Sequence, residues 1–246
     1  MPPKRSLFVR LLRPIAILAV AWLALSWFAV LVLRFVPPWT SAVMMERRLS
    51  ALIHGESDLR LRYRWVPWSE VSPYVPMAMV AGEDQKFPFH HGFDFDSIHD
   101  AMDAAEDGKR LRGASTISQQ TAKNLFLWNG RSFVRKGLEA YFTVLIEATW
   151  PKQRILEVYM NIAELGDGVY GVGAASDAYF RTPPARLGPA QAARLAAVLP
   201  SPRRFKVAQP TPYVLSRAAW IQQQMGQLGG PGYLRGDMPA QVRRAR

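Results

Sequence analysis

Two adjacent carboxylates, Glu83 and Asp84, are the first residues of this sequence with a clear potential for chemistry. They stand at the expected end of a helix, in the segment AGEDQKFPFHHGFD at 81–94, beside the aromatic residues Phe87 and Phe89. A carboxyl group held near apolar rings has a raised pKa and can act as an acid or a base near neutral pH. The alternative is that the two residues are ordinary charges at a solvated helix end. For an isolated Glu-Asp pair, this alternative is the favoured interpretation.

His90 and His91 follow in the same segment and could in principle ligate a metal. Adjacent histidines point in different directions, and neither has a second histidine four residues away, which is the spacing of helical zinc ligands. The sequence therefore favours a hydrogen-bonding role within the fold.

A second polar segment, RGASTISQQTAKNL at 112–125, fits little more than two helical turns. Its polar members are Ser115, Thr116, Ser118, Gln119, Gln120, Lys123 and Asn124. Gln120, Lys123 and Asn124 have i, i+3, i+4 spacing and share one side of a helix, a donor-rich face that suits sugar hydroxyls and phosphate oxygens. A solvated helix face is the alternative.

Arg135, Lys136 and Glu139 form a third charged group. Arg135 and Glu139 are four residues apart, so an intrahelical ion pair is the default interpretation. Alternatively, two cations and a carboxylate facing a cleft could hold a pyrophosphate, with or without a divalent ion. The apolar run 125–128 and the turn 129–133 lie just before this group, and the sequence leaves open whether they belong to the core or dip into a bilayer surface.

Composition limits the classes of partner and of site. The 246 residues contain no cysteine, which excludes disulfides, thiolate metal sites and a cysteine nucleophile. The net charge of +12 favours an anionic partner, such as nucleic acid, a membrane surface or a phosphorylated substrate.

The N-terminal region narrows that choice. Lys4, Arg5, Arg10 and Arg13 precede residues 15–33, a run without charge that is long enough to span a hydrocarbon core of roughly 30 Å. The run is longer than the apolar region of a secretory signal, which indicates an uncleaved anchor. Because the basic residues favour a cytoplasmic N-terminus, the rest of the chain is expected outside, away from nucleic acid.

The periodicity predicts a mainly helical chain in five parts. These are a basic leader at 1–13, a transmembrane anchor helix at 14–36, a juxtamembrane connector at 37–64, a globular domain at 65–228 and a basic Gly/Pro-rich tail at 229–246. Helices are expected at 41–52, 75–83, 94–106, 115–125, 134–149, 155–163, 174–179 and 189–199. Pro37 and Pro38 should end the anchor helix.

The order and spacing of these segments resemble the peptidoglycan glycosyltransferase family, and most closely its single-domain members, the monofunctional biosynthetic transglycosylases. Five motifs carry the resemblance: EDQKFPFHHGFD at 83–94, GASTISQQTAKNL at 113–125, RKGLE at 135–139, KQRILEVYMN at 152–161 and GVYGVGAASDAYF at 168–180. The match spans roughly residues 65–210. Gly82, Pro88 and Ser118 occupy variable motif positions, Met160 replaces a frequent leucine, and no chemically needed group is missing.

The resemblance implies a lysozyme-like fold, with a globular head and a membrane-apposed jaw containing 125–133. It implies that lipid II is polymerised with inversion into β-1,4-linked glycan, with release of undecaprenyl pyrophosphate. Glu83 corresponds to the general base that deprotonates the acceptor's 4-hydroxyl, and Glu139 to a second essential carboxylate. Lys123, Arg135 and Lys136 would surround the diphosphate. Residues that would shape or line the cleft are Asp84, Phe87, His90, Ser115, Thr116, Gln120 and Asn124.

The same resemblance sets expectations for cofactors and partners. It requires no cofactor, although Glu139 could hold Mg²⁺ or Mn²⁺. The expected partners are lipid II, the growing glycan strand and membrane lipids, together with cell-wall synthases or division proteins. The alternatives are a glycan-cleaving lytic transglycosylase of lysozyme-like fold and a non-catalytic membrane-tethered scaffold. A bifunctional penicillin-binding protein would need an S-x-x-K motif, which the sequence lacks.

Overall fold

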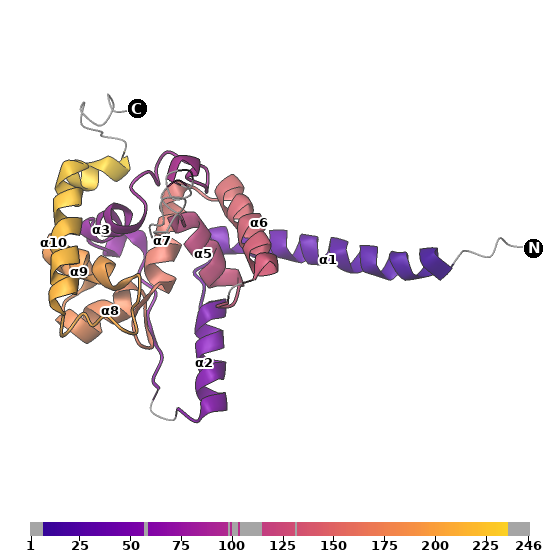
Figure 1. Cartoon of the computed structure of the whole chain (residues 1–246), viewed down its shortest axis with the longest axis horizontal. Helices are drawn as coiled ribbons and strands as arrows, with labels where there is room; N and C mark the ends of the chain where they lie inside the picture. The colour runs from indigo at the N-terminus through magenta and orange to yellow at the C-terminus, as the bar shows by residue number, and fades with distance from the viewer. Residues whose placement is uncertain are drawn as a thin grey trace, which may run out of the picture. The chain divides into compact units, whose positions relative to one another are not determined.

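The protein is mostly helical (Figure 1). The structure is a computed structural model, and it describes residues 7–56, 59–97, 99, 103, 115–130 and 132–235. The chain separates into two compact units, Met1–Pro37 and Pro38–Arg246. The first unit contains the apolar N-terminal helix, and the second contains the other helices with a small sheet. The predicted fold class, mostly α with one N-terminal apolar helix, is confirmed.

Helix α1 (Leu7–Phe35) forms the first unit. Its stretch Arg13–Phe35 has a mean hydropathy of 2.6, and within the part of the chain that the structure describes it is the one helix long and apolar enough to cross a membrane. The helix ends before Pro37, since proline cannot continue the hydrogen-bond ladder. It begins inside the predicted leader at 1–13, of which residues 1–6 lie outside the described residues.

Helix α2 (Ala42–His54) begins the second unit. The Ser41 hydroxyl caps it by accepting a hydrogen bond from a first-turn N–H at 3.3 Å. The buried Arg47 donates to Asp167 at 3.1 Å, which ties α2 to a loop more than a hundred residues away. The segment predicted as a connector at 37–64 is therefore built into the folded unit from Pro38 onward.

A small sheet, which the sequence did not predict, has the strand order β1-β3-β2. Strand β1 (Arg62–Tyr63) is parallel to β3 (Val169–Tyr170), and β2 (Glu164–Gly166) is antiparallel to β3. Gly171 follows β3 at φ 76°, where a Cβ atom would lie 2.1 Å from the Asn161 carbonyl oxygen. Only glycine fits this turn from the sheet into the next helix.

The remaining helices build the body of the second unit. They are α3 (Tyr74–Glu83), α5 (Ile117–Phe126), α6 (Phe133–Thr149), α7 (Lys152–Ile162), α8 (Gly171–Phe180), α9 (Pro189–Val198) and α10 (Pro212–Gln227), with short 3₁₀ turns η1 (Trp68–Glu70), η2 (Pro184–Arg186) and η3 (Gly230–Arg235). Helices α3, α9 and α10 pack against one another, as do α5, α6 and α7 (Figure 1). Helix α7 contacts α3 and so joins the two groups.

Helix α3 lies at the centre of the core. Its residues 75–81 are all buried, which agrees with a helix that is apolar on every side. The neighbouring α9 presents the small side chains of Ala192, Ala193 and Ala196, so the two helices approach closely. This packing fixes the C-terminal end of α3, where Glu83 and Asp84 stand.

Two expectations need correction, and one falls largely outside the described residues. Helix α10 was not predicted. The tail expected at 229–246 begins too early, because η3 belongs to the folded unit, where Tyr233 is buried and donates to the Gln85 carbonyl oxygen at 2.6 Å. The helix expected at 94–106 is described only in part. The other predicted helices agree with α2, α3 and α5 to α9 within a few residues.

Candidate active site

Glu83 is the last residue of α3, and its carboxylate is held from two sides. The Gln120 side-chain amide, from α5, donates to Oε2 at 3.0 Å. The Arg217 guanidinium, from α10, donates to Oε1 at 3.3 Å. Only 13% of the Glu83 side chain is exposed. Three helices far apart in the sequence thus converge on one carboxylate.

Burial changes the proton affinity of Glu83. Desolvation raises the pKa of its carboxyl group, and the negative charge of Asp84 adds to the increase. The hydrogen bond from Gln120 and the charge of Arg217 oppose it, because both favour the ionised form. The carboxylate therefore combines a raised proton affinity with partners that support its charge.

Tyr159 of α7 fixes the orientation of Gln120. Its hydroxyl donates to the Gln120 carbonyl oxygen at 3.1 Å, which leaves the amide NH₂ group for Glu83. Complete burial, with the charges of Glu83 and Asp84, raises the pKa of Tyr159 well above its ordinary value, so the phenol keeps its proton. Hydrogen bonds are therefore donated in one direction, from Tyr159 to Gln120 and from Gln120 to Glu83.

Asp84 stabilises the site through hydrogen bonds to its neighbours. Its carboxylate accepts from the Ile117 backbone N–H at 2.9 Å, at the N-terminal end of α5, and from His90 Nε2 at 3.0 Å. His90 Nδ1 in turn accepts from the Gly92 N–H at 3.1 Å, so the ring proton lies on Nε2. These bonds join the end of α3 to the start of α5, and they confirm a hydrogen-bonding role for His90.

The structure separates the residues expected to line the cleft into two groups. Phe87 is 1% exposed and packs edge-on against His90, which is hydrogen-bonded to Asp84. Neither side chain lines the cleft or the recess beside Glu83. Ser115 and Thr116 border a recess of about 290 Å³ that also exposes Glu83 and Asp84. Of this pair Ser115 is exposed, while the buried Thr116 caps α5. Phe87 and His90 are therefore supports and not substrate contacts.

A larger cleft, of about 460 Å³, is lined by Gln120 but not by Glu83. Gln120, Lys123 and Asn124 line it together, as their helical spacing predicted, while Ile117 and Thr121 face the core. Helix α2 and the segment after α9 complete the cleft with Glu46, Arg47, Ser50, Ser201 and Arg203. Burial lowers the pKa of Lys123, and the charge of Glu139 opposes that decrease.

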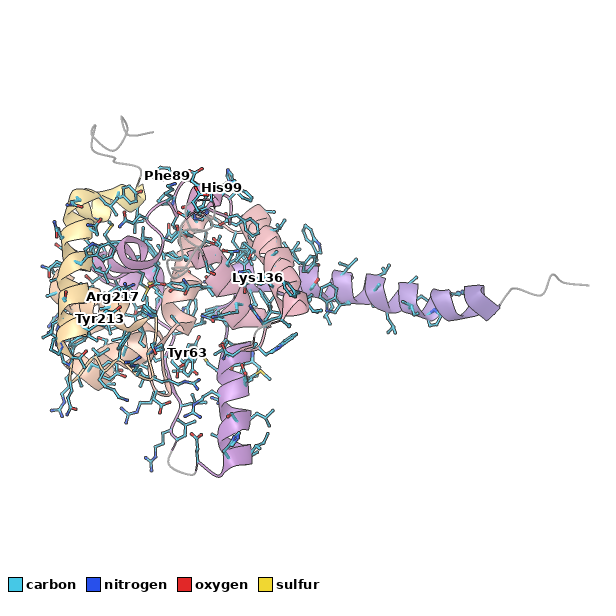
Figure 2. All side chains as sticks on the ribbon, in the orientation of Figure 1. Tyr63, Phe89, His99, Lys136, Tyr213 and Arg217 are labelled. Carbon is cyan, nitrogen blue, oxygen red and sulfur yellow. The ribbon has the colours of Figure 1, made fainter. Side chains whose placement is uncertain are left out.

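Glu139 sits between two cations on α6. Arg135 Nη1 donates to Oε2 at 2.6 Å and Lys136 Nζ donates to Oε1, while the Glu139 side chain is 4% exposed. The intrahelical ion pair is confirmed, and Lys136 remains half exposed. Figure 2 shows Lys136 on the α6 side of the unit and Arg217 on the α10 side.

This arrangement does not suit Glu139 as a metal ligand. Both of its oxygens already accept from cations. Within the described ranges, no three His, Asp or Glu side chains are grouped closely enough to hold a metal ion. The surroundings of Glu139 therefore fit an anion better than Mg²⁺ or Mn²⁺.

Comparison with known proteins places this arrangement in a family. A family model described as Transglycosylase matches residues 52–226. The chain belongs to the transglycosylase family. Similar curated proteins, each named "Biosynthetic peptidoglycan transglycosylase", include one from Xanthomonas campestris pv. campestris (strain B100), 53% identical over 95% of this chain and 94% of its own. Another, from Chromohalobacter salexigens, is 54% identical over 87% of this chain and 91% of its own. One from Xylella fastidiosa (strain 9a5c) is 55% identical over 85% of this chain and 86% of its own.

Membership of the transglycosylase family confirms the resemblance drawn from the five motifs and the lysozyme-like fold class. Sequence reasoning missed two residues of the site. Tyr159 lies in the fourth motif but received no role, and Arg217 lies on the helix that was not predicted. Thr211 and Pro212, a cap followed by proline at the first helical position, were the available signal for that helix.

Proposed function

We propose that this protein is a peptidoglycan glycosyltransferase that polymerises lipid II into β-1,4-linked glycan strands in cell wall synthesis. The observation that carries the proposal is the mostly buried Glu83 carboxylate, held by Gln120 and Arg217 beside a cleft lined with Lys123. The relatives from Xanthomonas, Chromohalobacter and Xylella, all named biosynthetic peptidoglycan transglycosylases, support the same reaction.

Glu83 acts as the general base in this proposal. It takes the proton from the 4-hydroxyl of the acceptor sugar, whose oxygen attacks the anomeric carbon of the donor. The bond from that carbon to the diphosphate oxygen breaks, and undecaprenyl pyrophosphate leaves with the electron pair. Attack opposite to the leaving group inverts the anomeric centre and forms the β-1,4 bond.

The cations assist the leaving group. Negative charge accumulates on the pyrophosphate in the transition state, and preorganised cations stabilise it most at that point. Lys123 lines the cleft, and Lys136 is half exposed beside the buried Glu139. Glu139 would hold Arg135 and Lys136 in place rather than take part in proton transfer. No acid is needed to protonate a pyrophosphate, so one base and a set of cations suffice.

The same features weigh against a lytic enzyme. A lysozyme-like hydrolase needs a protonated glutamic acid as its general acid. A raised pKa of Glu83 would suit that role too, but the cations Lys123 and Lys136 suit a pyrophosphate leaving group, which a lytic enzyme does not have. A non-catalytic scaffold would not need a buried glutamate with these partners.

The anchor and the exposed apolar surface support a location at a membrane. We infer that α1 crosses the cytoplasmic membrane with its N-terminus inside, because basic residues precede it, and that the catalytic unit lies outside. Helix α2 exposes Met45, Leu49 and Leu52, which have the spacing of one helical stripe, and Phe133 is 99% exposed. A lipid-linked substrate would reach the cleft from such a surface.

The test of this function is a reaction with purified lipid II. Full-length protein in detergent should produce muramidase-sensitive glycan and one undecaprenyl pyrophosphate for each bond formed. Release of anhydro-sugars from preformed peptidoglycan, without polymerisation, would show a lytic enzyme instead. Lipid II binding without either product would show a scaffold.

A further inference from the structure

Arg217 is the charged residue at the site that none of the five motifs contains. Its Nη2 atom donates to the Gly82 carbonyl oxygen at 3.2 Å and to Glu83 Oε1 at 3.3 Å. The guanidinium therefore binds both the backbone of Gly82 and the side chain of Glu83 at the end of α3. Its side chain is 22% exposed, so water screens this pair only in part.

The approach of α10 to α3 depends on Gly82. A Cβ atom at position 82 would lie 3.1 Å from Ile221 Cδ1 and 3.7 Å from the Ala196 Cβ atom, closer to Ile221 than ordinary van der Waals contact allows. Ile221 stands one helical turn beyond Arg217 on α10 and is fully buried. The absence of a side chain at Gly82 thus brings Arg217 within reach of Glu83.

Among the described residues around Glu83, Arg217 is the cation that contacts its carboxylate. Charged or titratable groups that face Glu83 or share its recess are Asp84, Lys86, Asp94, Tyr159 and Arg217. Lys86 is paired with Asp94 and Asp96, Asp84 is a like charge, and Tyr159 is neutral. Gln120 contributes a hydrogen bond but no charge.

We propose that Arg217 is a positioning residue that places a positive charge against the Glu83 carboxylate and fixes its direction. The proposal rests on the proposed function, in which Glu83 removes the acceptor's proton. With Oε1 held by Arg217 and Oε2 by Gln120, the carboxylate cannot rotate freely, and its remaining lone pairs are left to accept the acceptor's proton. Arg217 itself exchanges no proton and contacts no reacting atom.

The competing interpretation is an ordinary ion pair that joins α10 to α3. Such a pair would affect stability but not the pH dependence of the reaction. The base must be ionised to work, so kcat/KM falls as pH drops below the pKa of Glu83. Without the opposing positive charge that pKa rises further, and the acid side of the profile moves to higher pH.

The experiment measures kcat/KM for lipid II polymerisation against pH in three full-length variants. Arg217→Gln removes the charge, Arg217→Lys retains it, and Arg186→Gln removes the same charge from an exposed position on η2. We expect Arg217→Gln to move the acid midpoint up by about one pH unit, with about tenfold extra loss of rate below it. Arg217→Lys should restore most of the shift, and Arg186→Gln should match the unmodified protein.

Two outcomes overturn the proposal. If Arg217→Gln lowers the rate equally at every pH, or only lowers the unfolding temperature, the pair is structural. If Arg217→Lys behaves like Arg217→Gln although both fold, charge is not the cause. Failure of the proposed function is distinguishable, because the unmodified protein would then make no glycan from lipid II at any pH. Failure of the assignment of Glu83 as the base would leave a Glu83→Gln protein fully active.

Discussion

Glu139 shows how one residue can act through its neighbours. It is nearly excluded from solvent, yet Arg135 and Lys136 both donate to it. Removing one member of a buried charge group leaves the others uncompensated, which is costly. The carboxylate therefore determines where two cations stand, and its loss should disturb them more than it disturbs the helix.

Glu139→Gln tests this role. The side chain keeps its size but loses the charge that holds the cations, so kcat should fall about 100- to 1,000-fold. Because the account places no metal on Glu139, excess Mg²⁺ or Mn²⁺ should not restore the rate. The measurement is the rate of lipid II polymerisation with and without added metal. A kcat near that of the unmodified protein, or rescue by metal, would contradict this role.

Asp84 joins two elements through a single carboxylate, which accepts from Ile117 and His90. Asp84→Ala should lower the free energy of unfolding by about 3–5 kcal/mol, since two hydrogen bonds to a buried charged acceptor are lost. Denaturant unfolding measures the effect. The matched control is Asp96→Ala, whose exposed pair with Lys86 should contribute less than about 1 kcal/mol. Equal effects of the two substitutions would contradict the supporting role of Asp84.

Among the elements, α10 has the least obvious relation to the chemistry. It is a long way from Glu83 in sequence, but it delivers Arg217 because Gly82 permits close packing. The position of a charge at the active site is thus set by a contact between two helices.

Gly82→Val should separate these helices. The added atoms meet Ile221, so the free energy of unfolding should fall by about 1–3 kcal/mol. The displaced Arg217 should also reduce the polymerisation rate. Gly226→Val is the control, since nothing lies within 4 Å of the Cβ position there and valine should be tolerated on α10. If both variants have similar stability and activity, the close packing does not position Arg217.

The elements also show what the sequence could and could not predict. Helices α5 and α6 were predictable because their apolar residues recur at helical spacing and a Ser or Thr caps each first turn. Helix α10 buries only Val214, Ile221 and Met225, a pattern too sparse to indicate a buried face. Strands of two or three residues are too short to show alternation.

The candidate site divides in the same way. The Arg135–Glu139 pair lies within one helix, so its spacing alone predicted the contact. The Glu83–Arg217 contact joins residues 134 positions apart, and no local pattern could have indicated it. The burial of Phe87 and His90 likewise depends on how the loop folds back, which the motif letters do not show.

At the scale of the whole molecule, the apolar helix α1 suggests a membrane anchor, and the proposed substrate is lipid-linked. The net charge of +12 suits anionic lipid headgroups and a pyrophosphate. The exposed apolar stripe of α2 belongs to the second unit, so that unit should have a membrane affinity of its own.

A chain beginning at Pro38 tests that affinity in co-sedimentation with anionic phospholipid vesicles. It should bind, and the combined change Met45→Ser, Leu49→Ser and Leu52→Ser should weaken binding about 10- to 100-fold because apolar area is lost. Leu215→Ser, an exposed leucine on α10, should have little effect. Equal binding by all three proteins would show that the α2 stripe is not a membrane surface.

The central claim, that a buried Glu83 is the base of a glycosyl transfer, is tested most directly by Glu83→Gln in the full-length protein. The measurement is the initial rate of lipid II polymerisation together with the Kd for lipid II. The account predicts a rate loss of about 1,000-fold or more, with little change in Kd, because the amide fits the site but cannot accept the proton. Glu70→Gln, at an exposed position of η1, should retain full activity. A Glu83→Gln protein that polymerises lipid II at the rate of the unmodified protein would contradict the account.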